Sequence, residues 1–197
     1  MVFHPLLMPT YLFALILYYM PVSALSLPMS SRWMVLGLIF FTTFIIPGLG
    51  AYTMVRVGHL DSLEMDKREQ RRLPFLFTGL CYAITAYLLY RETVFDDIFH
   101  FIMVIISASV FLAYFISLIW KVSAHSIGVG GALGLLLVIS KLLPEAFMLG
   151  PIIVAIFLSG LVLSARLALH AHTPAQVYTG FLSGLMLSVI AAFIALT

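Results

Sequence analysis

The chain has 197 residues, of which 63% are hydrophobic and 9% charged, and its mean hydropathy is +1.15. This composition excludes an ordinary soluble domain, in which about half of the residues are apolar and about a quarter are charged. The formal net charge of +2 is too small to indicate a nucleic-acid partner, and a single cysteine excludes a disulfide framework. We therefore predict an all-α integral membrane protein, with one domain over residues 1–197.

Long apolar runs predict the membrane-spanning helices, since one crossing needs about 20 residues. The first run covers residues 6–26 and is interrupted by Pro21. The clearer runs are Trp33–Val55, Phe75–Tyr90, Ile98–Trp120, Ser126–Leu142, Pro151–Leu169 and Gln176–Thr197. We expect a bundle of six to seven transmembrane helices. If all seven runs cross, the loops 56–74, 121–125 and 170–175 lie on one face of the membrane.

Loop 56–74 is the most charged part of the chain. Asp61 and Glu64 predict the start of a short interfacial helix that stops before Pro74. On such a helix basic residues form two pairs at four-residue spacing, Lys67 with Arg71 and Arg68 with Arg72. Like charges at that spacing repel by about 0.2–0.5 kcal/mol, and a bound anion would relieve this. A solvated basic loop beside lipid headgroups explains the same residues equally well.

Loop 121–125 joins the fourth and fifth predicted spans. Ser123 has the character of a helix N-cap, so an anion could meet the unpaired N–H groups of the next turn. His125 follows at the start of that helix, where a histidine is more often an ordinary interfacial residue. The glycines behind it indicate close helix packing, and they are Gly128, Gly130, Gly131 and Gly134.

The segment 165–180 is a polar island between two apolar runs. Pro174 suits the first position of a helix, which makes Thr173 the N-cap and Gln176 the partner in a Thr-x-x-Gln capping box. Arg166 lies at the end of the preceding helix and His172 lies in the turn. Cationic and imidazole groups beside free helix N–H groups predict an anion site.

The order of these three segments resembles the type 2 phosphatidic acid phosphatase family. The third segment is similar to the signature Ser-Arg-x5-His-x3-Asp, through Arg166 and His172, but with Ala165 and Gln176 in place of the Ser and Asp. The first is similar to Lys-x6-Arg-Pro, through Lys67 and Arg72, with Arg71 as a rival for the arginine. The second, Val-Ser-Ala-His, resembles Pro-Ser-Gly-His through Ser123 and His125. The resemblance covers about residues 66 to 180, within a phosphatase-like core of about 56–197.

The resemblance implies hydrolysis of a lipid phosphate or pyrophosphate through a phosphohistidine, with no metal or other cofactor. By position, His172 would attack phosphorus and His125 would protonate the leaving oxygen. The phosphoryl oxygens would be held by Lys67, Arg72 or Arg71, Ser123 and Arg166. The Gln176 amide either orients His172 in place of the family Asp or only closes its capping box, and both interpretations stay open.

Three alternatives also fit the sequence. His170 and His172 with His125 could bind zinc. A magnesium-dependent prenyltransferase would need two Asp-rich motifs on one face, and only loop 56–74 offers one. A non-catalytic protein that binds phospholipid or isoprenoid phosphate is favoured by the neutral Gln176.

The membrane orientation is open. The Lys and Arg residues of the motif loops place them in the cytoplasm by the positive-inside rule. The resemblance to bacterial relatives favours the outer side of the plasma (inner) membrane.

Overall fold

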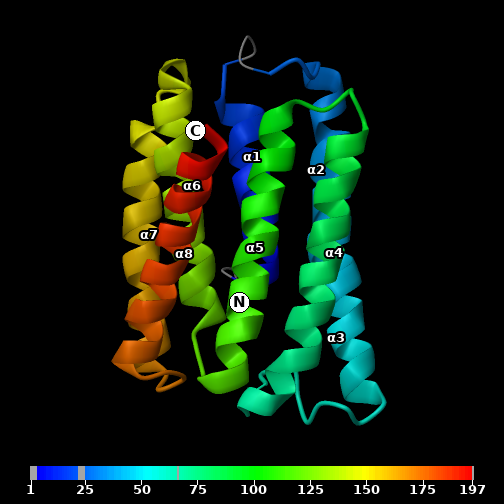
Figure 1. The fold of residues 1–197 in the computed structure, drawn as a ribbon, viewed down its shortest axis with the longest axis vertical. Helices are drawn as coiled ribbons and strands as arrows, with labels where there is room; N and C mark the ends of the chain where they lie inside the picture. The colour runs from blue at the N-terminus through cyan, green and yellow to red at the C-terminus, as the bar shows by residue number, and fades with distance from the viewer. Residues whose placement is uncertain (1–3, 22–24, 66, 197) are drawn as a thin grey trace.

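The structure is a computed structural model that describes residues 4–21, 25–65 and 67–196, and every element in that part of the chain is helical. The helices run mostly parallel or antiparallel to one long axis (Figure 1). In chain order they are α1 (Met8–Tyr19), α2 (Arg32–Phe40), α3 (Ile46–Arg56), α4 (Arg72–Arg91), α5 (Asp97–Ile119), α6 (Ala124–Leu142), α7 (Leu149–Ala168) and α8 (Pro174–Leu196).

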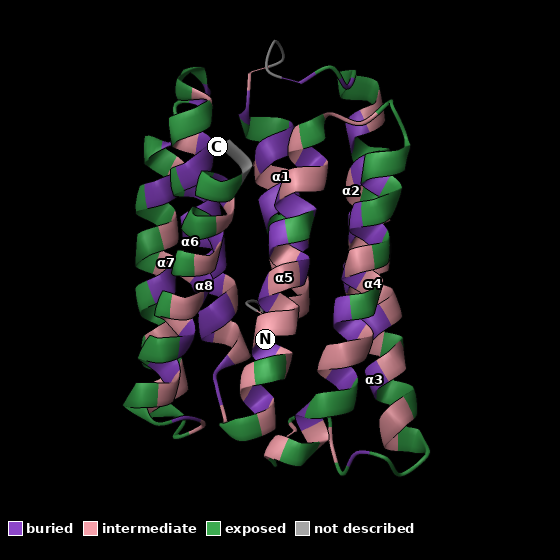
Figure 2. Cartoon of the chain, viewed as in Figure 1, coloured by how far each residue is buried: buried purple, intermediate pink, exposed green. Residues whose placement is uncertain are grey.

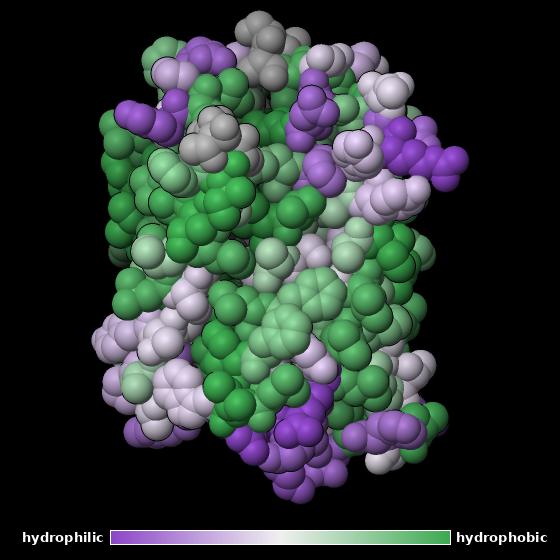
Figure 3. Space-filling view, in the orientation of Figure 1, coloured by the Kyte–Doolittle hydropathy of each residue, from purple (hydrophilic) through white to green (hydrophobic). Residues whose placement is uncertain are grey.

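Six helical segments in the described part of the chain are long and apolar enough to cross a membrane. They are Met29–Arg56, which contains α2 and α3, and the segments of α4 to α8. Apolar side chains cover the middle of the molecule, and hydrophilic ones gather at its two ends (Figure 3). The predicted all-α membrane bundle is confirmed, and this chain is an integral membrane protein.

The first predicted span is shorter than expected. The run 6–26 contains only the 12-residue helix α1 after a 3-10 turn at Pro5–Leu7, and its residues 22–24 lie outside the described part. Twelve residues reach about 18 Å, less than the ~30 Å of the hydrocarbon layer. The fully buried Arg32 donates to the carbonyls of Leu17 and Leu27, which satisfies the end of α1 inside the bundle.

Helices α2 and α3 are joined by a π-helical turn, Phe41–Ile45, just before Pro47. Proline has no N–H, so in an α-helix the carbonyl of Thr43, four residues earlier, would lose its partner. The hydroxyl of the buried Tyr82 on α4 donates to this carbonyl at 3.0 Å. A hydrogen bond between helices thus replaces the one that proline removes.

The loops α3–α4, α5–α6 and α7–α8 all lie at the same end of the bundle, the lower end in Figure 1. This agrees with the alternation of the predicted spans. The expected helix from Asp61 to before Pro74 is wrong. Residues 61–65 form turns, a 3-10 helix covers Arg68–Arg71, and α4 follows at once with Pro74 inside its first turn. A proline is tolerated there because the first N–H groups of a helix have no intrahelical partner.

Helix α6 is the most buried of the spans (Figure 2) and packs closely on α8. Glycines on both helices make this contact possible. A Cβ built on Gly130 would lie 2.1 Å from the Phe181 carbonyl oxygen, and one on Gly184 would lie 2.2 Å from that of Ile127. Close approach of α6 and α8 is what brings the α5–α6 loop to the start of α8.

We expect Gly184→Ala to destabilise the protein, because the added methyl group meets backbone that cannot move aside. Overpacking of this kind costs about 1–3 kcal/mol. On α7, a methyl group added to Gly160 would meet no atom within 4 Å, so Gly160→Ala should be neutral or stabilise through helix propensity. Thermal unfolding in detergent, followed by circular dichroism, measures the melting temperatures of the two variants and of the wild type. Equal melting temperatures for the two variants would contradict this packing.

Candidate functional site

A pocket of about 190 Å³ opens at the motif end of the bundle. One water molecule needs only about 10–15 Å³ of such water-accessible space, so the pocket has room for a phosphate group. Its charged and histidine side chains come from segments far apart in the sequence, and they are His4, Glu64, Arg71, His125, Arg166 and His172. Mostly apolar residues of α1, α3, α4, α5, α6 and the α3–α4 loop form the rest of the wall.

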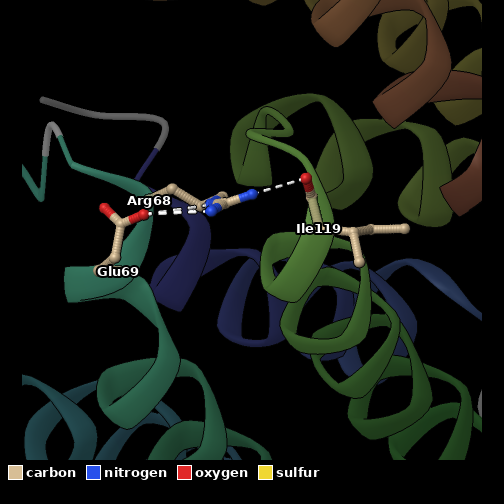
Figure 4. A network of polar contacts seen from close by, with 3 residues as sticks. All are labelled: Arg68, Glu69 and Ile119. Atoms are coloured by element: carbon tan, nitrogen blue, oxygen red, sulfur yellow. Dashed lines mark hydrogen bonds and ion pairs between the residues drawn. The ribbon is translucent and has the colours of Figure 1, made fainter.

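Arg71 reaches the pocket because the basic loop is held against the α5–α6 loop. Its Nε donates to the Met65 carbonyl at 2.9 Å, and its Nη1 donates to the Val122 carbonyl at 2.8 Å. Arg68 donates to the Ile119 carbonyl at the end of α5 and also pairs with Glu69 (Figure 4). Residues three apart in a 3-10 helix lie one above the other, so both arginines face the same neighbour.

Lys67 and Arg72, which the resemblance placed beside the phosphate, do not line the pocket. Lys67 is exposed and forms an ion pair with Asp61 at 2.8 Å. Arg72 is exposed at the first position of α4. The 3-10 conformation of Arg68–Arg71 also removes the four-residue spacing that predicted repulsion between basic side chains. Of the two candidate arginines, the structure brings Arg71 to the site.

Ser123 is the N-cap of α6, as the sequence predicts. Its hydroxyl accepts a hydrogen bond from the Ser126 amide at 3.3 Å. The Ser123 amide donates to the Gln176 carbonyl at 3.4 Å, which links this loop to the first turn of α8. Ser123 is fully buried behind the pocket wall, while its neighbour His125 lines the pocket.

Gln176 serves both of the roles that the sequence left open. Its Oε1 accepts from the Thr173 amide at 3.3 Å, and its own amide donates to the Thr173 hydroxyl at 3.4 Å, which completes the capping box. The same Oε1 lies 3.0 Å from Nδ1 of His172. Because the Thr173 amide can only donate, the atom facing it is oxygen, and His172 Nδ1 must donate to it as well. The neutral ring therefore carries its proton on Nδ1 and a lone pair on Nε2.

His172 stays neutral at physiological pH. It is buried in the turn between α7 and α8, and burial lowers its pKa to about 4 against the opposing effect of the Gln176 hydrogen bond. The positive charges of Arg71, Lys121 and Arg166 lower the pKa further. A neutral imidazole with a free Nε2 is a competent nucleophile.

Arg166, in the last turn of α7, contributes a donor with no partner. Its Nε is buried and makes no hydrogen bond to any residue that the structure describes. A buried donor without a partner is costly, by about 1–3 kcal/mol. An anion in the pocket would satisfy it, and phosphate suits the planar guanidinium.

His4 is a pocket residue that our reading of the sequence missed. It caps the 3-10 turn before α1, with its Nδ1 accepting from the Leu6 amide at 3.3 Å, and burial lowers its pKa. Its ring centroid lies 6.2 Å from that of His125 in an edge-to-face contact. The signal was present as His4-Pro5, a polar residue directly before a proline that opens an apolar run.

His170 is exposed and adopts a left-handed conformation, with φ of 49°, at the end of α7. It does not line the pocket, so the three-histidine zinc site is not assembled. Within the described residues, no three His, Cys, Asp or Glu side chains are grouped to hold a metal ion.

Comparisons of this chain with family models, with curated proteins and with solved structures gave no match. The fold and the site therefore define the class on their own. The protein is a membrane-embedded helical bundle with a pocket of arginine and histidine side chains at one end.

We expect Gln176→Glu to raise the pKa of His172, because a carboxylate stabilises the imidazolium where the amide does not. An opposite charge this close shifts a pKa by about 1–3 units. Glutamate also suits the third position of a capping box, so the helix start should persist. Histidine NMR titration of the purified protein measures the shift.

Ala175→Glu is the matched control, since it adds the same charge at the neighbouring exposed position of α8. We expect a smaller rise of the His172 pKa in this variant. An unchanged His172 pKa in Gln176→Glu would contradict the hydrogen bond between the two side chains.

Proposed function

We propose that this protein hydrolyses the phosphate ester or pyrophosphate of a membrane lipid through a phosphohistidine intermediate, without a metal. The observation that carries the proposal is the pocket that assembles Arg71, His125, Arg166 and His172 at one end of a transmembrane bundle. The free-energy cost of burying a phosphate without hydrogen-bond or charge partners is prohibitive. This pocket offers such partners at one end of the bundle.

In the proposed first step, Nε2 of His172 forms a bond to phosphorus as the P–O bond to the lipid breaks. His125, which takes up a proton as the anionic substrate binds beside it, gives that proton to the leaving oxygen. Arg71 and Arg166 bind the phosphoryl oxygens, whose charge is spread in the transition state. In the second step water attacks phosphorus and gives a proton to His125, the P–N bond breaks, and inorganic phosphate leaves.

Gln176 supports a second candidate, a protein that binds lipid phosphates without turnover. A neutral amide orients the His172 ring but does not neutralise the cation that forms when the ring is phosphorylated. In a serine protease, the analogous Asp-to-Asn change lowers the rate about 10⁴-fold, largely through the wrong tautomer. Here Gln176 holds the productive tautomer, with the proton on Nδ1, which favours the enzyme over the binder.

The experiment is phosphate release by purified protein from a panel of lipid mono- and pyrophosphates, with and without a chelator. We expect release that the chelator does not change. Chelator-sensitive release would contradict the metal-free mechanism, and tight binding of the lipids without release would favour the second candidate.

We place this activity at the outer side of a bacterial plasma membrane. The motif loops are rich in basic residues, but Arg68 and Arg71 donate to backbone carbonyls and Arg71 also lines the pocket, so we do not count these two as signals of orientation. Labelling of a Ser62→Cys variant by an impermeant thiol reagent on intact cells tests this orientation. Labelling only after lysis would place the site in the cytoplasm.

A further inference from the structure

A second, larger hollow lies between α1, α6 and α7. Its volume is about 600 Å³, within the roughly 300–1,000 Å³ usual for ligand sites. The lining is almost entirely apolar and includes Leu12 and Tyr19 of α1, Ala132 and Leu136 of α6, and Ala155 and Leu158 of α7. We call this hollow the α1–α7 groove.

The α1–α7 groove adjoins the polar pocket. Three residues line both of them, namely Met8 and Leu12 of α1 and Ala132 of α6. These shared side chains stand between the two hollows, so a ligand with its anionic end at His125 and Arg166 would enter the groove by passing Ala132. The polar pocket has apolar walls of its own, and the groove extends this apolar surface to α7.

Tyr19 lines the far end of the α1–α7 groove. The Tyr19 hydroxyl, at the end of α1, donates to the Phe147 carbonyl at 3.3 Å, and a Cβ on Gly150 would lie 3.6 Å from the same hydroxyl. From Met8 to Tyr19 the groove follows α1 for about 16 Å at 1.5 Å per residue. This is roughly half of the ~30 Å hydrocarbon layer, the depth of one leaflet.

We propose that the α1–α7 groove binds one hydrocarbon chain of the lipid whose phosphate occupies the polar pocket. The inference rests on the proposed function for the identity of the headgroup. In the bilayer the chain exchanges lipid contacts for packing against these apolar side chains, and the groove orients the lipid so that its phosphate meets His172.

Ala155→Phe on α7 tests the groove, because the larger side chain fills space in the groove. Ala155 does not line the polar pocket, so that pocket should be unaffected. The matched control is Ile153→Phe on the same helix, at an exposed position outside the groove. The two substrates are a long-chain and a short-chain alkyl phosphate. We expect Ala155→Phe to lower hydrolysis of the long-chain substrate about tenfold or more, the scale on which apolar pockets discriminate, and to leave the short-chain rate unchanged. Ile153→Phe should change neither rate.

Direct photolabelling tests whether the groove binds a hydrocarbon chain, and it does so independently of turnover. The probe is a long-chain alkyl phosphate that carries a diazirine at the end of its chain. We expect label on α1 and α7 residues of the groove, with displacement by excess short-chain alkyl phosphate and weaker labelling of Ala155→Phe. Label elsewhere, or label that excess alkyl phosphate does not displace, would overturn the proposal.

The two hypotheses fail differently. If the wild type hydrolyses neither substrate but the groove is labelled as expected, the proposed hydrolysis fails and the groove stands. If both substrates are hydrolysed and Ala155→Phe slows both equally, or neither, the groove fails and the proposed hydrolysis stands.

Discussion

His172→Ala should abolish phosphate release, with a fall of about 10³–10⁴-fold or to background, because the variant has no group to accept the phosphoryl. In the proposed mechanism the nucleophile is the Nε2 lone pair of His172, which the hydrogen bond between Nδ1 and Gln176 leaves available. The wild type treated with substrate and quenched should carry protein-bound phosphate that is acid-labile and alkali-stable, as a phosphohistidine is. The variant should carry none. Phosphate release and trapping of the intermediate measure the two effects.

His170→Ala is the control for this substitution. His170 lies two residues away in the same turn, but it is exposed and outside the pocket. Its removal should leave both phosphate release and the trapped intermediate unchanged. If His172→Ala retained wild-type turnover while folded, the phosphohistidine mechanism would be excluded.

Arg166→Gln should lower the rate about 10²–10³-fold, the effect of removing a donor that stabilises transition-state charge. The Nε of Arg166 is buried without a hydrogen-bond partner among the described residues. The substitution therefore removes no hydrogen bond of Nε within the protein, and the fall in rate should report the lost interaction with the anion. Steady-state kinetics on a lipid phosphate should show a lower kcat. KM should also rise if Arg166 binds the phosphate of the substrate before the reaction as well as in the transition state.

Arg56→Gln is the matched control, an exposed arginine on the same membrane face that does not line the pocket. It should leave kcat unchanged. Arg166→Lys should recover only part of the activity, because an ammonium group does not make the two parallel hydrogen bonds of a guanidinium. A folded Arg166→Gln variant with a rate near that of the wild type would remove Arg166 from the site.

Much of the fold followed from the apolar runs. In a bilayer an apolar segment must satisfy its backbone hydrogen bonds internally, so a run of about 20 residues has a single solution, the helix. Alternation of those helices across the membrane then placed the three motif loops at one end, as the structure has them. The prediction of a span over the run 6–26 was wrong, because α1 ends at Tyr19, shortly before Pro21, and is too short to cross the membrane.

Local hydrogen bonds were predictable for a similar reason. The caps at Ser123 and Thr173 depend on residues within three positions along the chain, so the sequence contains both partners. The double role of Gln176 was not predictable. It depends on the rotamer of His172, which the turn after α7 and the surrounding side chains determine.

Six of the spans, their order, the caps at Ser123 and Thr173 and the face on which the motifs lie could therefore be predicted from the chain alone, because each depends on neighbouring residues or on the thickness of the bilayer. The set of side chains that share the pocket depends instead on how the helices pack. Arg71 is selected over Arg72 by the Val122 carbonyl, 51 residues away, and His4 enters the site because α1 packs beside α6. Contacts between segments so distant in sequence leave no local pattern, since they arise only when the helices come together.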